Sequence, residues 1–196
     1  MRIPITAIAS RAAGSARDLI LNQPPSLGDS DCEALHDGLF AQPVNTVTSL
    51  SFLGVGLWAA VRVPSVQRED RAAATVFASL VALNGVGSAA YHGPQFPGSQ
   101  TLHDVPAYGV VVLGAAVPLW RRLRGRKALP GWTNAKGYGM LASNAVAAGS
   151  YVEGRSASRM CKPDSWVQLH GLWHLSTASI MAIWATVLWP EADSHV

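Results

Sequence analysis

The chain has 196 residues, enough for one compact domain and hardly for two. Only 14% of the residues are charged and 49% are hydrophobic, whereas about a quarter of a typical soluble domain is charged. A soluble Ala-rich helical bundle would carry charges along every helix, but here they are confined to short stretches between long apolar runs. The net charge of +3 does not indicate nucleic-acid binding, because the basic residues lie at the ends of apolar runs without interleaved aromatic residues.

Residues 1–40 are the first expected unit, a non-cytoplasmic lead-in segment that is too short for a core of its own. Arg11, Arg17 and Asp18 interrupt any apolar stretch that could serve as a signal peptide. We therefore expect this segment to be retained and partly amphipathic.

Five apolar stretches follow, and each is expected to form a membrane helix. A hydrocarbon core about 30 Å thick needs roughly 20 mostly apolar helical residues. The third and fourth stretches reach this length only with flanking residues. The expected fold is therefore all-α, a polytopic transmembrane helix bundle over residues 41–190 with a cytoplasmic tail at 191–196. The expected helices cover 43–61, 72–91, 102–120, 134–152 and 167–189.

The loops between these helices predict the orientation of an integral, multi-pass membrane protein. Five helices place the N-terminus and the loops 93–101 and 154–165 on one side, and the loops 62–71 and 121–133 with the C-terminus on the other. The second side carries most of the loop Arg and Lys residues, so the positive-inside rule predicts a non-cytoplasmic N-terminus and a cytoplasmic C-terminus. Tryptophans near helix ends predict an interfacial belt: Trp58, Trp120, Trp132, Trp166 and Trp189.

The two cysteines fall on the same predicted side. Cys32 precedes the first helix and Cys161 precedes the fifth, so both are expected outside the cytoplasm, where a disulfide could form. Two unpaired thiols are the alternative, because the sequence does not give their separation.

Histidines at helix ends are the strongest functional signal. His170 and His174 are four residues apart, a spacing that stacks two imidazoles on one helix face and lets them hold one metal ion. Ser88 and His92 share this spacing on the second helix. With five helices, the end of the second, the start of the third and the start of the fifth lie at the same end of the bundle, so these residues can meet.

Three neutral imidazoles provide the open coordination typical of catalytic zinc, which activates water and polarises a carbonyl. Ser88 could stabilise an oxyanion, and Asp104 at the start of the third helix could carry a proton. Ionisable groups within membrane helices are costly and usually functional. The alternatives are histidines that only pack at helix ends, and haem ligation, which two histidines four residues apart fit poorly.

Five motifs in order resemble those of the alkaline ceramidases, which belong to the CREST superfamily of membrane hydrolases together with adiponectin-receptor-like proteins. The resemblance covers about residues 32–177. Its motifs are Cys32-Glu33, Pro43-Val-Asn45-Thr46, Gly85-Val-Gly87-Ser88 with His92, Gln100-x-Leu102-x-Asp104-x-Pro106, and His170-x-x-Trp173-His174.

This resemblance implies a zinc-dependent amidase that cleaves the N-acyl bond of ceramide or a related lipid amide within the bilayer. Its zinc ligands would be His92, His170 and His174, with Ser88 beside the metal. It also implies that Cys32 and Cys161 are paired. A receptor-like or structural zinc-binding membrane protein of the same superfamily, without turnover, is the alternative function. No oligomeric state follows from the sequence.

The chain also departs from the family pattern. Alignment on the third-helix motif places His103 where the family has its catalytic Asp, with Asp104 one residue later, so His103 competes with Asp104 for the role of proton carrier. The family has seven helices, and five are expected here. A calcium site would need an acidic cluster before the first helix, and Gln42 replaces one of its glutamates. Such a cluster, or else a solvated acidic segment, would comprise Asp29, Asp31, Glu33 and Asp37.

Overall fold

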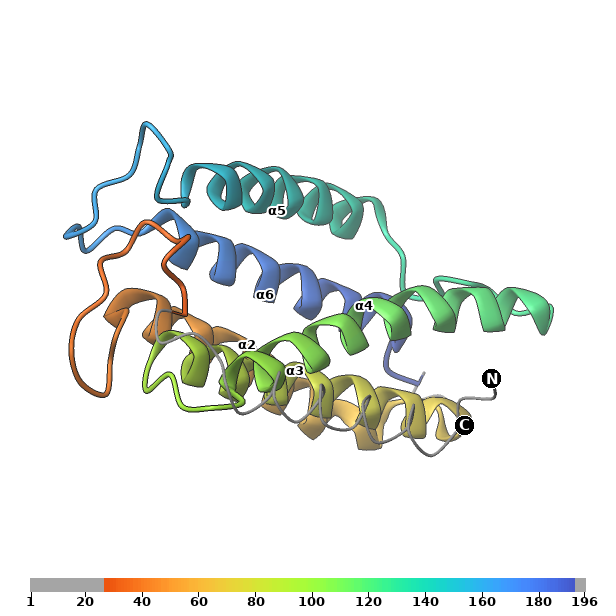
Figure 1. The fold of residues 1–196 in the computed structure, drawn as a ribbon. Coiled ribbons are helices and arrows are strands. Elements are labelled where there is room, and N and C mark those ends of the chain that lie inside the picture. The colour runs from red at the N-terminus through yellow and green to blue at the C-terminus, as the bar shows by residue number, and fades with distance from the viewer. Residues whose placement is uncertain (1–26, 193–196) are drawn as a thin grey trace, which may run out of the picture.

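The computed structural model describes residues 27–192, so most of the predicted lead-in, at residues 1–26, and residues 193–196 of the predicted tail lie outside the described residues. The described part is all-α, as predicted, and every predicted helix matches an observed one (Figure 1). The third helix differs most, because it starts at Ser99 and ends at Leu123. The α-helices are α2 Pro43–Arg62, α3 Arg71–His92, α4 Ser99–Leu123, α5 Asn134–Glu153 and α6 Leu169–Leu188, and the short 3-10 turns are η1 Val63–Ser65 and η2 Arg68–Asp70.

Four of these helices are long and apolar enough to cross a membrane, which makes the chain a multi-pass membrane protein. They are the spans Pro43–Ser65, Arg68–His92, Ser99–Leu123 and Leu169–Leu188. The fourth predicted span, α5, ends one residue later than predicted and is long enough, but its composition is too polar to mark it as a span.

The helices pack as a group of three, α2, α3 and α4, and a pair, α5 and α6, joined through α2 and α6. α2 packs against α3 and α6, α4 packs along α3, and α5 packs along α6. Close approach of α2 and α3 depends on glycine: a Cβ at Gly56 would lie 2.4 Å from the backbone nitrogen of Ala82, and one at Gly85 would lie 2.3 Å from that of Leu53. Small residues at contacts are how membrane helices gain van der Waals packing without an aqueous hydrophobic effect.

One end of the bundle, here called the first end, gathers the segments expected on the non-cytoplasmic side. It holds residues 27–42, the start of α2, the end of α3 and the start of α6 (Figure 1). Gln42 N donates to His92 O at 2.8 Å, and Cys32 N donates to Gly154 O at 2.8 Å. A disulfide joins Cys32 to Cys161, with their Cα atoms 5.3 Å apart, which confirms the expected pairing.

The second end carries the basic loops. Val66 and Glu191 form an isolated bridge, which holds the chain after α6 against the 62–71 loop, and Gly131 N donates to Val187 O at 3.0 Å, which holds the last turn of α6 against the 121–133 loop. The prediction that Trp189 belongs to an interfacial belt is wrong, because Trp189 is only 3% exposed and its ring lies 5.0 Å from that of Phe77.

Candidate metal centre

Three buried imidazoles meet at the first end of the bundle, as the helix spacing predicted. His92 is the last residue of α3, and His170 and His174 lie in the first turns of α6. Their ring centroids are 4.7 to 5.1 Å apart, and one potential ligand atom from each lies within 4.8 Å of the other two. Each of the three residues is at most 5% exposed. The three rings therefore provide a compact donor set shielded from solvent.

The hydrogen bonds of Gln42 fix the tautomer of His92. Gln42 Nε2 donates to the carbonyl oxygens of Gly28 and Glu33 at 2.9 and 3.0 Å. Its Oε1 must therefore accept, and it lies 2.6 Å from His92 Nδ1. His92 Nε2 is buried and has no hydrogen-bond partner among the described residues, so its lone pair is free for a metal ion.

The same arrangement recurs at His174. Its Nδ1 lies 3.0 Å from the hydroxyl oxygen of Thr48, which itself donates to Val44 O at 2.8 Å and therefore accepts from the imidazole. His174 Nε2 is also buried without a partner among the described residues. Protein acceptors that hold the second ring nitrogen are characteristic of metal-binding histidines.

Asp31, which the sequence indicated only for a possible calcium site, is a member of the histidine site. Its side chain is buried, and its Oδ1 lies 2.8 Å from Arg155 Nη1 and 3.3 Å from His170 Nδ1, while Oδ2 lies 3.9 Å from His92 Nδ1. Burial raises the pKa of the Asp31 carboxyl to about 6, although the Arg155 guanidinium acts to lower it. Its sequence signal was its place in the acidic cluster before the first helix.

The other predicted calcium residues have structural partners or are exposed. Glu33 accepts hydrogen bonds from the backbone nitrogens of Val44 and Asn45 at 2.6 and 2.8 Å, and so caps the start of α2. Burial raises the pKa of Glu33, and these two hydrogen bonds act to lower it. Asp29 and Asp37 are exposed. Within residues 27–192, the three histidines form the one group of three or more candidate ligands, so nothing here supports a calcium site.

Ser88 lies completely buried, in a chain of hydroxyl groups that leads to His174. Ser49 Oγ donates to Asn45 O at 2.6 Å, so the hydroxyl of Ser88, 2.8 Å from Ser49 Oγ, is the donor in that pair. Ser49 Oγ in turn lies 3.5 Å from His174 Nδ1. Ser88 is thus linked to the metal-site histidines through Ser49.

His103 and Asp104 face the same cavity and contact each other, with His103 Nδ1 2.6 Å from Asp104 Oδ1. The ring centroid of His103 is 6.4 Å from that of His92. Because Nδ1 of His103 donates to the carboxylate, the two residues that competed for one role in the sequence form a pair in the structure.

Two cavities meet beside the histidines. The first, of about 330 Å³, is lined by Asp31, His92 and His170 together with the His103–Asp104 pair. The second, of about 830 Å³, lies between α4, α5 and α6 and has mostly apolar walls. Val111, Tyr151 and Trp173 line both cavities, so an elongated apolar molecule in the second can present a polar group to the histidines.

The donor chemistry fits a transition metal. Three neutral imidazoles with a neighbouring cavity suit zinc, copper, iron or nickel, and zinc is the usual metal for a three-histidine site with an open position. The two buried, unpartnered Nε2 atoms of His92 and His174 need such a partner, because buried polar atoms are rarely left unsatisfied. The fold and site together define a multi-pass helical membrane protein with a buried trihistidine cluster. Comparisons of the chain with protein-family models, curated proteins and solved structures find no match.

Proposed function

We propose that this protein is a zinc-dependent integral membrane amidase that hydrolyses the N-acyl bond of ceramide or a related lipid amide. The observation that carries the proposal is the convergence of His92, His170 and His174, with protein acceptors on Nδ1 of two of them. The resemblance of the sequence motifs to alkaline ceramidases supports the reaction class. When bound there, zinc supplies activation of water and polarisation of the amide carbonyl.

Partners of the histidines hold the donor set in place. Gln42 and Thr48 keep the proton on Nδ1 of His92 and His174, so that both rings offer Nε2. Asp31 would do the same for His170, whose Nδ1 has no hydrogen-bond partner among the described residues: a small rotation would turn the 3.3 Å contact into a hydrogen bond from Nδ1, and Arg155 holds the carboxylate in position. All three rings then bind through the same atom, and a carboxylate partner makes an imidazole a stronger donor.

The proton carrier in this proposal is Asp104. Its Oδ1 accepts from His103, which leaves Oδ2 to carry a proton to the leaving amine. His103 orients the carboxylate from the same helix turn. Ser88 is the proposed donor to the developing oxyanion. Because its hydroxyl is buried against Ser49 and Ser88 lines neither cavity, this role requires the hydroxyl to turn away from Ser49.

The larger cavity supports a lipid as substrate. Its walls come from three helices and include Val110, Ile180, Met181 and Trp184, which suit a hydrocarbon chain. α5 packs mainly against α6 and makes little contact with α4, so this cavity lies where the bilayer flanks the bundle. An acyl chain there would place its amide near Tyr151 and Trp173, at the boundary with the histidine cavity.

The proposed orientation places the first end outside the cytoplasm and the C-terminus inside. The basic loops at the second end support this through the positive-inside rule. The Cys32–Cys161 disulfide supports it independently, because disulfides persist in oxidising compartments.

The test is a paired measurement of metal and turnover in His170→Ala. Detergent-purified wild-type protein is expected to contain zinc in a near one-to-one ratio and to cleave fluorescent N-acyl lipids. His170→Ala is expected to lose both properties, because two imidazoles hold zinc poorly. His36→Ala, in the exposed part of the first-end loop, is the matched control and should keep both.

Two outcomes would argue against the proposed zinc amidase. Hydrolysis that persists in a metal-free preparation would contradict a zinc amidase. Wild-type protein that binds zinc but cleaves none of the lipid amides would favour the receptor-like or structural alternative.

A further inference from the structure

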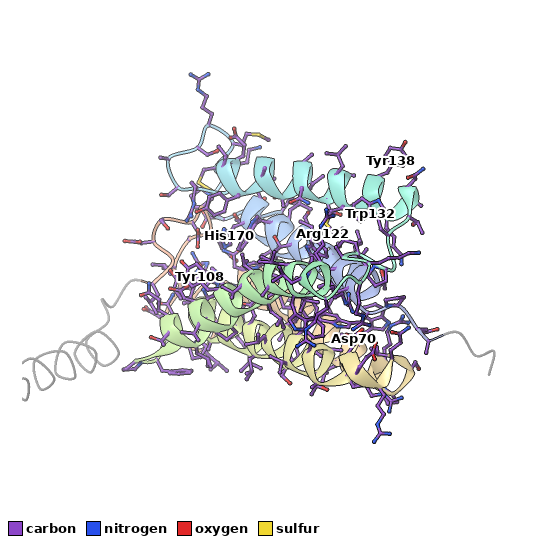
Figure 2. The ribbon with its side chains drawn as sticks, turned by 90° about the vertical axis from the view of Figure 1, so that its right-hand side faces the viewer. Asp70, Tyr108, Arg122, Trp132, Tyr138 and His170 are labelled. Carbon is purple, nitrogen blue, oxygen red and sulfur yellow. A yellow bond between two sulfur atoms is a disulfide. The ribbon has the colours of Figure 1, made fainter. Side chains whose placement is uncertain are left out.

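A second polar cavity lies at the opposite end of the bundle from the histidines. Its volume is about 250 Å³, and it opens between η2, the end of α4 and the chain after α6. Figure 2 shows Asp70, one of its lining residues, far along the bundle from His170. The lining residues are Gln67, Asp70, Arg121, Arg126, Lys127, Pro130 and Pro190.

Arg121 is the unusual member of this cavity. Its side chain is only 1% exposed, and its Nη2 donates to Asp70 Oδ2 at 2.7 Å. Its Nε and Nη1 are buried without a hydrogen-bond partner among the described residues. A buried guanidinium group with two unsatisfied nitrogens is costly, and an acceptor at the cavity would remove that cost.

The charges around the cavity favour an anion as that acceptor. Arg121, Arg126 and Lys127 line it with Asp70 as the single carboxylate. Arg126 is held by Glu69 at 2.5 Å and lies 3.6 Å from Asp70, whereas Lys127 has no ion pair among the described residues. The positive charge therefore exceeds the negative charge at the cavity wall.

The position of the cavity near the membrane–water interface indicates which anion it binds. Arg124 and Arg126 lie over the half-exposed ring of Trp120, at 5.6 and 5.9 Å, an arrangement typical of the membrane–water interface. Phosphate is the anion that a bilayer presents at this depth, and basic pockets between membrane helices bind lipid head groups. Arginine pairs with phosphate through charge-assisted hydrogen bonds.

We propose that the cavity formed by Arg121, Arg126, Lys127 and Asp70 is a phosphate-binding site. Its ligand is either the phosphate of an anionic phospholipid head group or free inorganic phosphate. The proposal concerns the second end alone and does not depend on the activity proposed for the histidines.

The test compares Lys127→Gln with Arg122→Gln. Both variants remove one exposed positive charge at the second end, so they lose the same general attraction to anions. Only Lys127 lines the cavity, so a difference between the variants reports on the cavity itself. Substitution of Arg121 is avoided, because its ion pair with Asp70 is buried. Binding is followed as the rise in unfolding midpoint in detergent with inorganic phosphate, and by mass spectrometry of protein released from nanodiscs of phosphatidylcholine with or without phosphatidic acid.

We expect wild type and Arg122→Gln to bind the phosphate group equally, and Lys127→Gln to bind it about five- to tenfold more weakly. A response to phosphatidic acid alone identifies a lipid head group, and a response to inorganic phosphate alone identifies a free anion. No response to either probe, or equal weakening in both variants, would overturn the site.

Discussion

Asp31 supports the metal site only through its neighbours, because its carboxylate contacts His170 and is held by Arg155. It reaches His170 from a loop, and Arg155 holds it there at 2.8 Å. We expect Asp31→Asn to lower zinc affinity about 10- to 100-fold, the usual effect of removing a partner of a metal-binding histidine. The measurement is competition with a chromophoric chelator in detergent.

The matched control for this prediction is Asp29→Asn, which removes the same charge from the same loop at an exposed position. Asp31→Glu should recover part of the affinity, because it restores a carboxylate. Wild-type zinc affinity in Asp31→Asn would show that the contact with His170 does not support the metal site.

Only some residues of the site could be predicted from the sequence. The pair His170 and His174 was predictable, because four-residue spacing on a helix fixes a shared face regardless of tertiary structure. Asp31, Gln42 and Thr48 were not singled out for the site, because their contacts with the imidazoles depend on how α2 and the preceding loop pack against α3 and α6. A single sequence carries no signal for that packing.

Glycine contacts set the distance between α2, which carries Thr48, and α3, which ends at His92. Gly56→Ala would place a methyl group 2.7 Å from Ala82 Cα, so the helices would have to separate. We expect destabilisation of about 1–3 kcal/mol, the usual cost of overpacking a close contact. The measurement is the unfolding midpoint of detergent-purified protein.

Gly54→Ala is the control for this effect, because it makes the same change one half-turn away on α2, where a Cβ meets nothing within 4 Å. It should leave the midpoint unchanged or raise it slightly, since alanine favours helix over glycine. Equal midpoints for Gly56→Ala and Gly54→Ala would argue against close packing of α2 on α3.

At the scale of single elements, the helices were the most predictable feature, because a charge-free apolar run of about 20 residues is typical of a membrane helix. α5 shows the limit of this reasoning. Its bounds agree with the prediction, yet its composition does not identify it as a span, and Lys136 near its start donates to Thr186 O of α6. What holds α5 in the bundle is its packing against α6, which composition does not encode.

At the scale of the whole molecule, the number of helices decides at which end of the bundle the disulfide, the histidines and the basic loops lie. Four α-helices, α2 to α5, lie between Cys32 and Cys161, so the chain returns to the first end, and both cysteines and all three histidines of the cluster lie there. The predicted division into a lead-in, a membrane domain and a tail stays a prediction, because residues 1–26 and 193–196 lie outside the described part.

The orientation of the bundle can be measured with single cysteines, because both native cysteines are joined in the disulfide and leave no free thiol. Ala157→Cys places an exposed thiol in the first-end loop, and Arg124→Cys places one in a basic loop at the second end. We expect a membrane-impermeant maleimide to label Ala157→Cys in intact cells and Arg124→Cys only after permeabilisation, because the positive-inside rule predicts that the basic loops stay in the cytoplasm. The reverse pattern would contradict the orientation, and labelling of both thiols in intact cells would contradict a membrane crossing between the two loops.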